Sequence, residues 1–159
     1  MNDTSEYGFS GQLPPSRFNM ARYCISQPAT NYPEKAALKV FDNEDGVRLS
    51  RSWTYGELDR EVRRVAGGLL NRGFSPGDRI LIRLNNCAEY ALLFFGSICA
   101  GLVPIPVSSQ LSNAEILFFL EDSGAKGLAA PANIKLPNLP RQLTRLSAED
   151  VGEMANAGN

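Results

Sequence analysis

Apolar and polar residues along the chain follow two spacings, a period of two that is typical of strands and a period near 3.6 that is typical of helices. The period of two comes first, over residues 36–55, where apolar side chains alternate on both sides of the pair Asp45-Gly46. Because this pair favours a tight turn, the pattern predicts a β-hairpin. Arg51 is the one break in its second arm.

A helix pattern follows the hairpin directly. Thr54 and Glu57 have the spacing of a capping box, and Gly73 is placed to end the helix in a left-handed conformation. The tetrapeptide SPGD at residues 75–78 then favours a type II turn. The predicted buried face of the helix consists of Leu58, Val62, Val65, Ala66, Leu69 and Leu70.

The strand and helix patterns then repeat over residues 79–130. Two aliphatic segments, RILIRL and LVPIPV, are each followed by a helix pattern, and a weaker strand candidate, AKGLAA, comes last. The predicted helix starts are Asn86 with Glu89 and Ser112 with Glu115, and the predicted ends are Gly101 and Gly124. This order predicts an α/β fold, a partial doubly wound, mainly parallel sheet with flanking helices, preceded by a β-hairpin.

Two prolines in the segment LVPIPV need a structural explanation. Pro104 and Pro106 are two residues apart, so both missing N–H donors fall on the same side of the strand. This arrangement suits a strand whose one side faces an edge, a bulge or another subdomain. The alternative is a strand-entry residue plus a bulge in an otherwise paired strand, and the sequence leaves both open.

Three segments are expected along the chain. Residues 1–35 form an amino-terminal arm with one short helix capped by Ser16, and residues 36–130 form the α/β unit. Residues 131–159 are mostly polar and are interrupted by prolines, with only a short possible helix after Ser147. This composition predicts a connector. Because no closing strand is evident there, we expect the chain to be cut from a longer protein.

A membrane span is considered and disfavoured. Tyr90 to Val107 is free of charge over eighteen residues, but Pro104, Pro106 and Gly101 favour a buried helix followed by a strand. The start of the chain lacks the features of a secretory signal, and the three cysteines have neither disulfide-framework nor zinc-site spacing. A cytoplasmic protein is therefore expected.

Charge and motifs exclude several kinds of chemistry. Sixteen basic and seventeen acidic residues give no sign of a nucleic-acid partner, and the absence of histidine excludes histidine triads and histidine-ligated metals. Neither phosphate-loop motif occurs. The basic residues Arg60, Arg63 and Arg64 are interpreted as a solvated helix face, and Cys87 and Cys99 as buried thiols on an apolar helix. No catalytic residue and no metal ligand is predicted.

Polar residues at two strand ends are the remaining site candidates. Asn85 and Asn86 follow RILIRL, and Ser108 and Ser109 follow LVPIPV. Ligands of open α/β sheets bind outside the carboxyl ends of the strands, which makes these four residues weak candidates for a cleft. Helix capping by Asn86 and turn formation by the serines are the competing structural explanations.

The segment from Ser52 to Ala130 resembles the amino-terminal region of the adenylate-forming enzymes, which include acyl-CoA synthetases and AMP-dependent ligases. The resemblance lies in WTYGELD, GFSPGDRI, NNCAEY, CAGLVPIPV and LEDSGAK, in the order and near the spacing of that family. The form AGLVPIPV followed by LSNAEI, with RFNMARYCI near the start, is most similar to the benzoate-CoA ligase branch. The segment AKGLAA departs from the family, which usually has a β-branched strand there, so this strand is expected to be weak or shifted.

The resemblance implies a parent enzyme that joins a carboxylic acid, aromatic or fatty, to coenzyme A through an acyl-adenylate, with ATP and Mg²⁺. The family's glycine-rich loop and late lysine have no matching positions in this chain, so no cofactor is expected to bind this part and the isolated chain is expected to be inactive. Two alternatives stay open: a free-standing α/β binding or interaction module, and a membrane-associated element built on Tyr90 to Val107. Exposed apolar surface is expected to make the chain a homo-oligomer.

Overall fold

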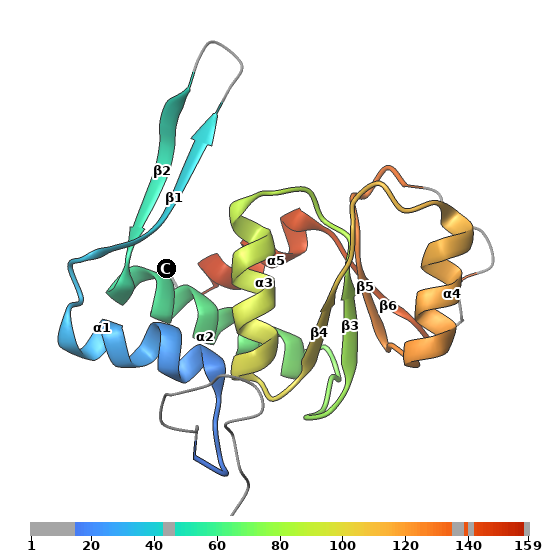
Figure 1. The fold of residues 1–159 in the computed structure, drawn as a ribbon, viewed down its shortest axis with the longest axis horizontal. Helices are drawn as coiled ribbons and strands as arrows, with labels where there is room; N and C mark the ends of the chain where they lie inside the picture. The colour runs from blue at the N-terminus through green and yellow to red at the C-terminus, as the bar shows by residue number, and fades with distance from the viewer. Residues whose placement is uncertain (1–14, 43–46, 135–138, 140–141, 158–159) are drawn as a thin grey trace, which may run out of the picture.

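The computed structural model describes residues 15–42, 47–134, 139 and 142–157, which form a projecting hairpin and a helix-covered sheet (Figure 1). The hairpin consists of β1 (Ala36–Asp42) and β2 (Arg48–Thr54), and the predicted turn Asp45-Gly46 lies outside the described residues. The sheet is four-stranded and parallel, in the order β4-β3-β5-β6. The α/β class predicted from the sequence is confirmed.

The amino-terminal helical segment differs from its prediction. Helical conformation begins at Met20, not after Ser16, and passes through a π-helical segment, η2 (Arg22–Ser26), into α1 (Gln27–Asn31). Pro28 gives the physical reason for the π turns, since a proline in a regular helix would collide with the carbonyl four residues earlier.

Arg51, the break in the hairpin pattern, has a clear role. Its guanidinium carbon lies 4.1 Å from the centroid of the Trp53 ring, and its Nη2 lies 3.2 Å from the Glu61 carboxylate. Trp53 is buried and pairs with Leu38 across the hairpin. The arginine therefore covers the outer side of a core aromatic residue and ties the hairpin to the following helix.

Helix α2 (Tyr55–Asn71) begins and ends as predicted. The Thr54 N–H donates to the Glu57 carboxylate at 2.8 Å, and the Glu57 N–H donates to Thr54 Oγ1 at 3.3 Å, which completes the capping box. Gly73 has a φ of 89°, as a left-handed helix end requires. Gly77, with a φ of 90°, supplies the third position of the predicted type II turn.

Helix α3 (Ala88–Cys99) starts later than predicted, whereas α4 (Asn113–Ser123) starts as predicted. Cys87, not Asn86, is the N-cap residue of α3, and no side chain caps the helix, so the predicted pair of Asn86 and Glu89 is wrong. The capping box of Ser112 and Glu115 is present. The difference arises because Cys87 takes the extended backbone that a cap needs (φ −135°, ψ 171°), which moves the helix start one residue beyond Asn86.

The position of β4 (Val103–Pro106) answers the question raised by its prolines. It pairs only with β3 (Arg79–Ile82) among the described strands, and the N–H groups of Val103 and Val107 donate to the Asp78 and Ile82 carbonyls. The proline nitrogens alternate with these donors and face away from β3. The missing donors therefore lie on the open edge, where they interrupt no ladder bond.

The last part of the sheet adds elements that the sequence did not predict. Strand β6 (Thr144–Leu146) pairs with β5 (Gly127–Ala129), so residues expected to form a connector extend the sheet. Helix α5 (Ala148–Asn156), the short helix expected after Ser147, packs against α2 and α3. The glycine that makes β5 a weak strand candidate has a physical reason. A Cβ at Gly127 would lie 2.8 Å from the Phe74 ring, which occupies that space.

The two faces of the sheet have separate cores. Helices α2, α3 and α5 cover one face, and α4 covers the other (Figure 1). On the three-helix face a Cβ at Gly96 would lie 2.6 Å from Val65 Cγ1, so the glycine allows α3 to approach α2 closely. No helix in the described part of the chain has the length and apolar character needed to cross a membrane.

Candidate functional site

The order of the strands defines one point where the sheet offers a crevice. The chain runs from β3 through α3 to β4 on one side, and then through α4 to β5 on the other side of β3. The carboxyl ends of β3 and β5 are therefore the topological switch point, the place where open α/β sheets bind ligands.

The four predicted site residues lie at the carboxyl edge of the sheet, but only two of them follow a switch-point strand. Asn85 and Asn86 come after β3 and are exposed. Ser108 and Ser109 come after the edge strand β4, and Ser108 Oγ accepts from the Gln110 N–H at 3.2 Å. Turn formation thus occupies Ser108, and a ligand contact at any of the four stays a prediction.

Arg83 is the residue that sequence reasoning missed. It directly follows β3, is only 8% exposed, and its N–H donates to the Ala129 carbonyl of β5 at 2.8 Å. Its Nη2 donates to the Leu111 carbonyl at 2.8 Å, but its buried Nε and Nη1 have no hydrogen-bond partner among the described residues. The signal was a charged residue inside the aliphatic run RILIRL, on the same strand face as Leu81.

The start of α4 lies beside Arg83, because Leu111 immediately precedes the cap residue Ser112. Hydrogen bonds from the Ser112 side chain and backbone lower the pKa of Glu115 below its usual value. That carboxylate is engaged at the cap, with Ser112 Oγ and N–H at 2.7 and 2.8 Å from Glu115 Oε2. Glu115, the acidic residue nearest in sequence to Leu111, is therefore engaged in the helix cap.

Cys87 and Cys99 lack the surroundings that favour a reactive thiolate. Burial raises the pKa of both the Cys87 and the Cys99 thiol, which disfavours the reactive thiolate. Cys99 is the last residue of α3, as expected, whereas Cys87 lies at its N-cap and not within the helix.

The described glycines with positive φ have structural positions. Four glycines have positive φ, namely Gly73, Gly77, Gly101 and Gly124, and each lies in a tight turn or at a helix end instead of in a phosphate-binding loop. Within residues 15–42, 47–134 and 142–157, no group of three His, Cys, Asp or Glu side chains is placed to hold a metal ion.

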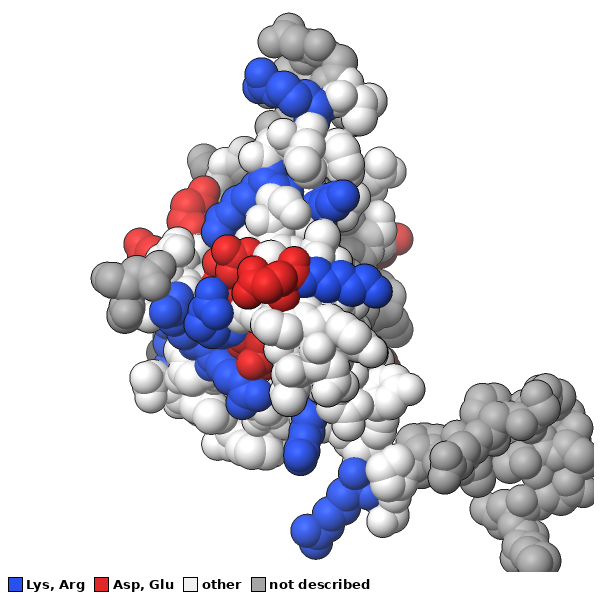
Figure 2. Space-filling view, turned by 90° about the vertical axis from the view of Figure 1, so that its left-hand side faces the viewer, with Lys and Arg blue, Asp and Glu red and all other residues white. Residues whose placement is uncertain are grey.

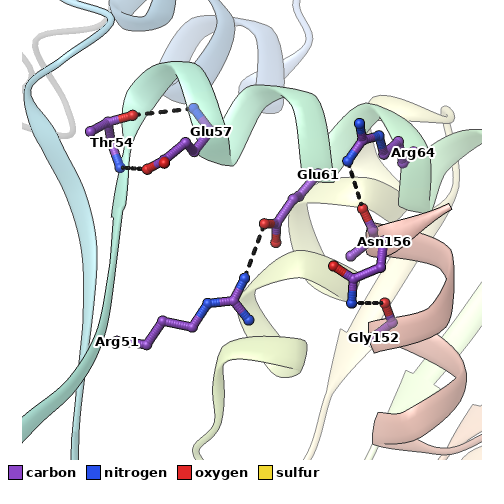
Figure 3. Close-up of polar contacts among 8 residues, drawn as sticks. Arg51, Thr54, Glu57, Glu61, Arg64, Gly152 and Asn156 are labelled. Carbon is purple, nitrogen blue, oxygen red and sulfur yellow. Dashed lines mark hydrogen bonds and ion pairs between the residues drawn. The ribbon is translucent and has the colours of Figure 1, made fainter. Parts of the chain in front are cut away.

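The outer face of α2 is charged but largely self-paired. Figure 2 shows basic and acidic side chains next to each other on this side of the molecule. Arg63 Nε donates to Asp59 at 2.8 Å, which raises the pKa of Arg63, and Arg64 Nη1 donates to the Ala155 carbonyl at 3.2 Å (Figure 3). The Arg63 pair agrees with the interpretation of this surface as a solvated face, whereas Arg64 is half-buried and bonds to α5.

Comparisons with known proteins give a consistent picture. The model of the AMP-binding enzyme family matches residues 25–156. The chain is 30% identical over 148 residues to 4-coumarate–CoA ligase 3 of Arabidopsis thaliana, covering 89% of this chain and 25% of that protein. It is 33% identical over 101 residues to acyl-CoA ligase SID4 of Ajellomyces capsulatus, covering 64% of this chain and 17% of that protein.

A solved structure supports the fold. The O-succinylbenzoate coenzyme A synthetase of Bacillus subtilis, in complex with ATP and a magnesium ion, matches with a TM-score of 0.71 at 24% identity, covering 86% of this chain and 34% of that chain. The present chain thus spans a quarter or less of the two curated relatives and about a third of the solved chain.

Proposed function

Because this chain belongs to the AMP-binding enzyme family, we propose that it is the amino-terminal part of a ligase that activates a carboxylic acid with ATP and transfers the acyl group to coenzyme A. The observation that carries the proposal is the family match across residues 25–156, which includes the hairpin, the sheet and α5. The relatives named acyl-CoA or 4-coumarate–CoA ligases support the same reaction type.

We propose an aromatic acid as the preferred substrate, with a fatty acid as the second class. The support is the segment AGLVPIPV with LSNAEI after it, which is most similar to the benzoate-CoA ligase branch. In chemical terms, a carboxylate is a poor electrophile, and its conversion to an acyl-adenylate makes it reactive toward the thiol of coenzyme A.

The described residues have a structural part in this proposal. The sequence contains neither phosphate-loop motif, and the described residues include no group of three metal-ligating side chains, so we propose that ATP and Mg²⁺ are held by other parts of the protein. We therefore propose that the 159-residue chain alone does not form acyl-adenylate. Its contribution is a rigid sheet whose helix-covered faces support the neighbouring catalytic parts.

The test uses the natural protein that contains these residues, isolated from the cells that produce it. Antibodies raised against the 159-residue chain would capture it, and acid-dependent exchange of pyrophosphate into ATP would be measured with benzoate, 4-coumarate and octanoate. We expect exchange with at least one aromatic acid, and no exchange by the isolated 159-residue chain with any acid.

Two results would contradict this proposal in different ways. Exchange by the 159-residue chain itself would show that catalytic groups are present in it. Absence of exchange from the captured protein with all three acids would instead favour the alternative of an α/β binding module, and immunodepleted extract provides the background rate.

A further inference from the structure

Arg79, the first residue of β3, and Arg83, which directly follows β3, lie at opposite ends of α4 and have opposite surroundings. Arg79 lies at the carboxyl end of α4, where its Nε donates to the Ser123 carbonyl and its Nη2 donates to the Gly124 carbonyl, both at 2.9 Å. A cation there is favoured by the helix dipole. Arg83 lies at the amino end of α4, where the same dipole disfavours a cation.

The surroundings of Arg83 are incomplete for a buried cation. Its side chain is more than nine-tenths buried and has one hydrogen-bond acceptor among the described residues, the Leu111 carbonyl. A buried guanidinium normally pairs with an anion, because an unpaired charge in the protein interior is strongly disfavoured. The arginine therefore favours an anion at this place, whereas the amino end of α4 already has the Glu115 carboxylate at its cap.

The segments on the α4 side of Arg83 contribute no free carboxylate. Residues 84–88, 100–114 and 123–148 contain no Asp or Glu, and Glu89 lies in the first turn of α3, which covers the other face of the sheet. Glu115 is engaged by Ser112 at the helix cap. No described carboxylate is hydrogen-bonded to Arg83, so its Nε and Nη1 are available to an anionic ligand.

The place itself is the one where a ligand is expected. The Arg83 N–H pairs with the end of β5, so the residue lies between the two strands of the switch point. We propose that Arg83 anchors a binding site for a carboxylate group at the carboxyl ends of β3 and β5. This inference goes beyond the proposed ligase activity, since no step of it uses ATP or coenzyme A.

The charge of the site selects the class of ligand. One guanidinium matches a monoanion, whereas a phosphate dianion would leave excess negative charge in a buried position. The planar guanidinium also matches the two oxygens of a carboxylate, to which Nη1 and the second Nη2 proton can donate.

The test titrates the 159-residue chain with sodium acetate at constant ionic strength, with sodium chloride as the balancing salt. The Nε–Hε resonance of Arg83 is followed by NMR, and the melting temperature is measured in parallel. We expect a saturable shift of the Arg83 resonance and a rise of several degrees in melting temperature with acetate. The rise in melting temperature should be absent in Arg83→Met.

Matched variants separate binding from general stabilisation. Arg145 is exposed and donates to a single carbonyl, that of Ile134, so Arg145→Met should keep the full response to acetate. Arg83→Lys keeps the charge without the planar group, and should bind acetate at least tenfold more weakly even if Arg83→Met does not fold.

Three outcomes would overturn the proposal. They are the absence of a saturable Arg83 shift with acetate, an equal response in Arg83→Met or Arg83→Lys, and binding of inorganic phosphate at pH 8 as tightly as acetate. The assay contains no nucleotide, so its failure would leave the proposed ligase function untouched, and the reverse also holds.

Discussion

The two faces of the four-stranded sheet are held by different forces. On the three-helix face, α2 and α3 pack closely at Val65 and Gly96, and the core is almost entirely apolar. On the α4 face the apolar cluster is smaller, and charged side chains at both strand ends fix the helix. Arg79 bonds to Ser123 and Gly124, and Arg83 bonds to Leu111. Lys126, which follows α4, pairs with Asp78 just before β3.

The comparison shows how a thinly covered face can hold its helix. Apolar burial needs area, which three helices provide and one helix does not. A hydrogen bond from a charged group needs little buried area, and each contributes roughly 1.5–3 kcal/mol to stability where it is shielded from water. We therefore expect the three-helix face to respond mainly to changes in volume, and the α4 face to respond also to changes in charge.

The largest expected effect comes from one truncation made on each face. Leu69 is 0% exposed in α2 and Leu120 is 4% exposed in α4. We expect Leu69→Ala to lower the free energy of unfolding by about 4 kcal/mol and Leu120→Ala by about 2.5 kcal/mol, because the α4 side can collapse more easily onto the lost volume. Urea unfolding measures both, and equal losses would contradict the difference between the faces.

A second pair of substitutions tests the close packing on the three-helix face. Gly67 has no atom within 4 Å of an added Cβ, whereas Gly96 faces Val65 at 2.6 Å. Helix propensity alone predicts that both changes to alanine stabilise by up to about 1 kcal/mol. We expect this for Gly67→Ala only, and a loss of about 1–2 kcal/mol for Gly96→Ala. Thermal unfolding distinguishes them, and stabilisation by both would show that the packing is loose.

The sequence predicted best those features that local chemistry decides. The capping boxes at Thr54 and Ser112 and the left-handed glycines Gly73 and Gly124 depend on neighbours within a few residues, and all are confirmed. Asn86 failed as a cap because an Asn with a Glu three residues later fits two possible helix starts, and the observed start uses Cys87.

Features that depend on distant contacts were less accessible. Strand β6 is only three residues long and has no period of its own, so its pairing with β5 could not be foreseen. Gly127 weakened the prediction of β5 because its reason, the Phe74 ring, comes from elsewhere in the fold. Arg83 was overlooked for the same cause, since its burial and its missing partners are properties of the folded chain.

Stability measured as a function of pH should show how much charged pairs contribute near α4. The hydrogen bond from Lys126 and the Ser75 N–H lower the pKa of Asp78 below its usual value, and Lys126 Nζ lies 2.7 Å from Asp78 Oδ1. The stability from this pair is present above the unfolded pKa and is lost as the pH falls through the lower folded pKa. It amounts to about 1 kcal/mol, since Lys126 is exposed.

Lys126→Met should therefore reduce stability at pH 7 and make the loss between pH 5 and 2 smaller than in the unchanged chain. Lys39→Met, an exposed lysine on the hairpin, serves as the control and should leave the acid profile unchanged. Urea unfolding at several pH values measures the difference. An identical profile for both variants would show that Lys126 does not hold α4 in place.

The smallest effect on stability concerns a region outside both faces. The hairpin exposes Val47 and Leu49 at 79% and 46%, and α4 exposes Phe118 at 62%. We propose that the chain associates with a second copy through the hairpin, because the hairpin combines apolar side chains with outer strand edges that pair with no other described strand (Figure 1). Val47→Lys with Leu49→Lys should then abolish association in sedimentation velocity while changing stability by less than about 0.5 kcal/mol.

Phe118→Lys should leave association intact. If Phe118→Lys alone disrupts it, the thin α4 face is the contact surface; a monomer at all concentrations would contradict association altogether.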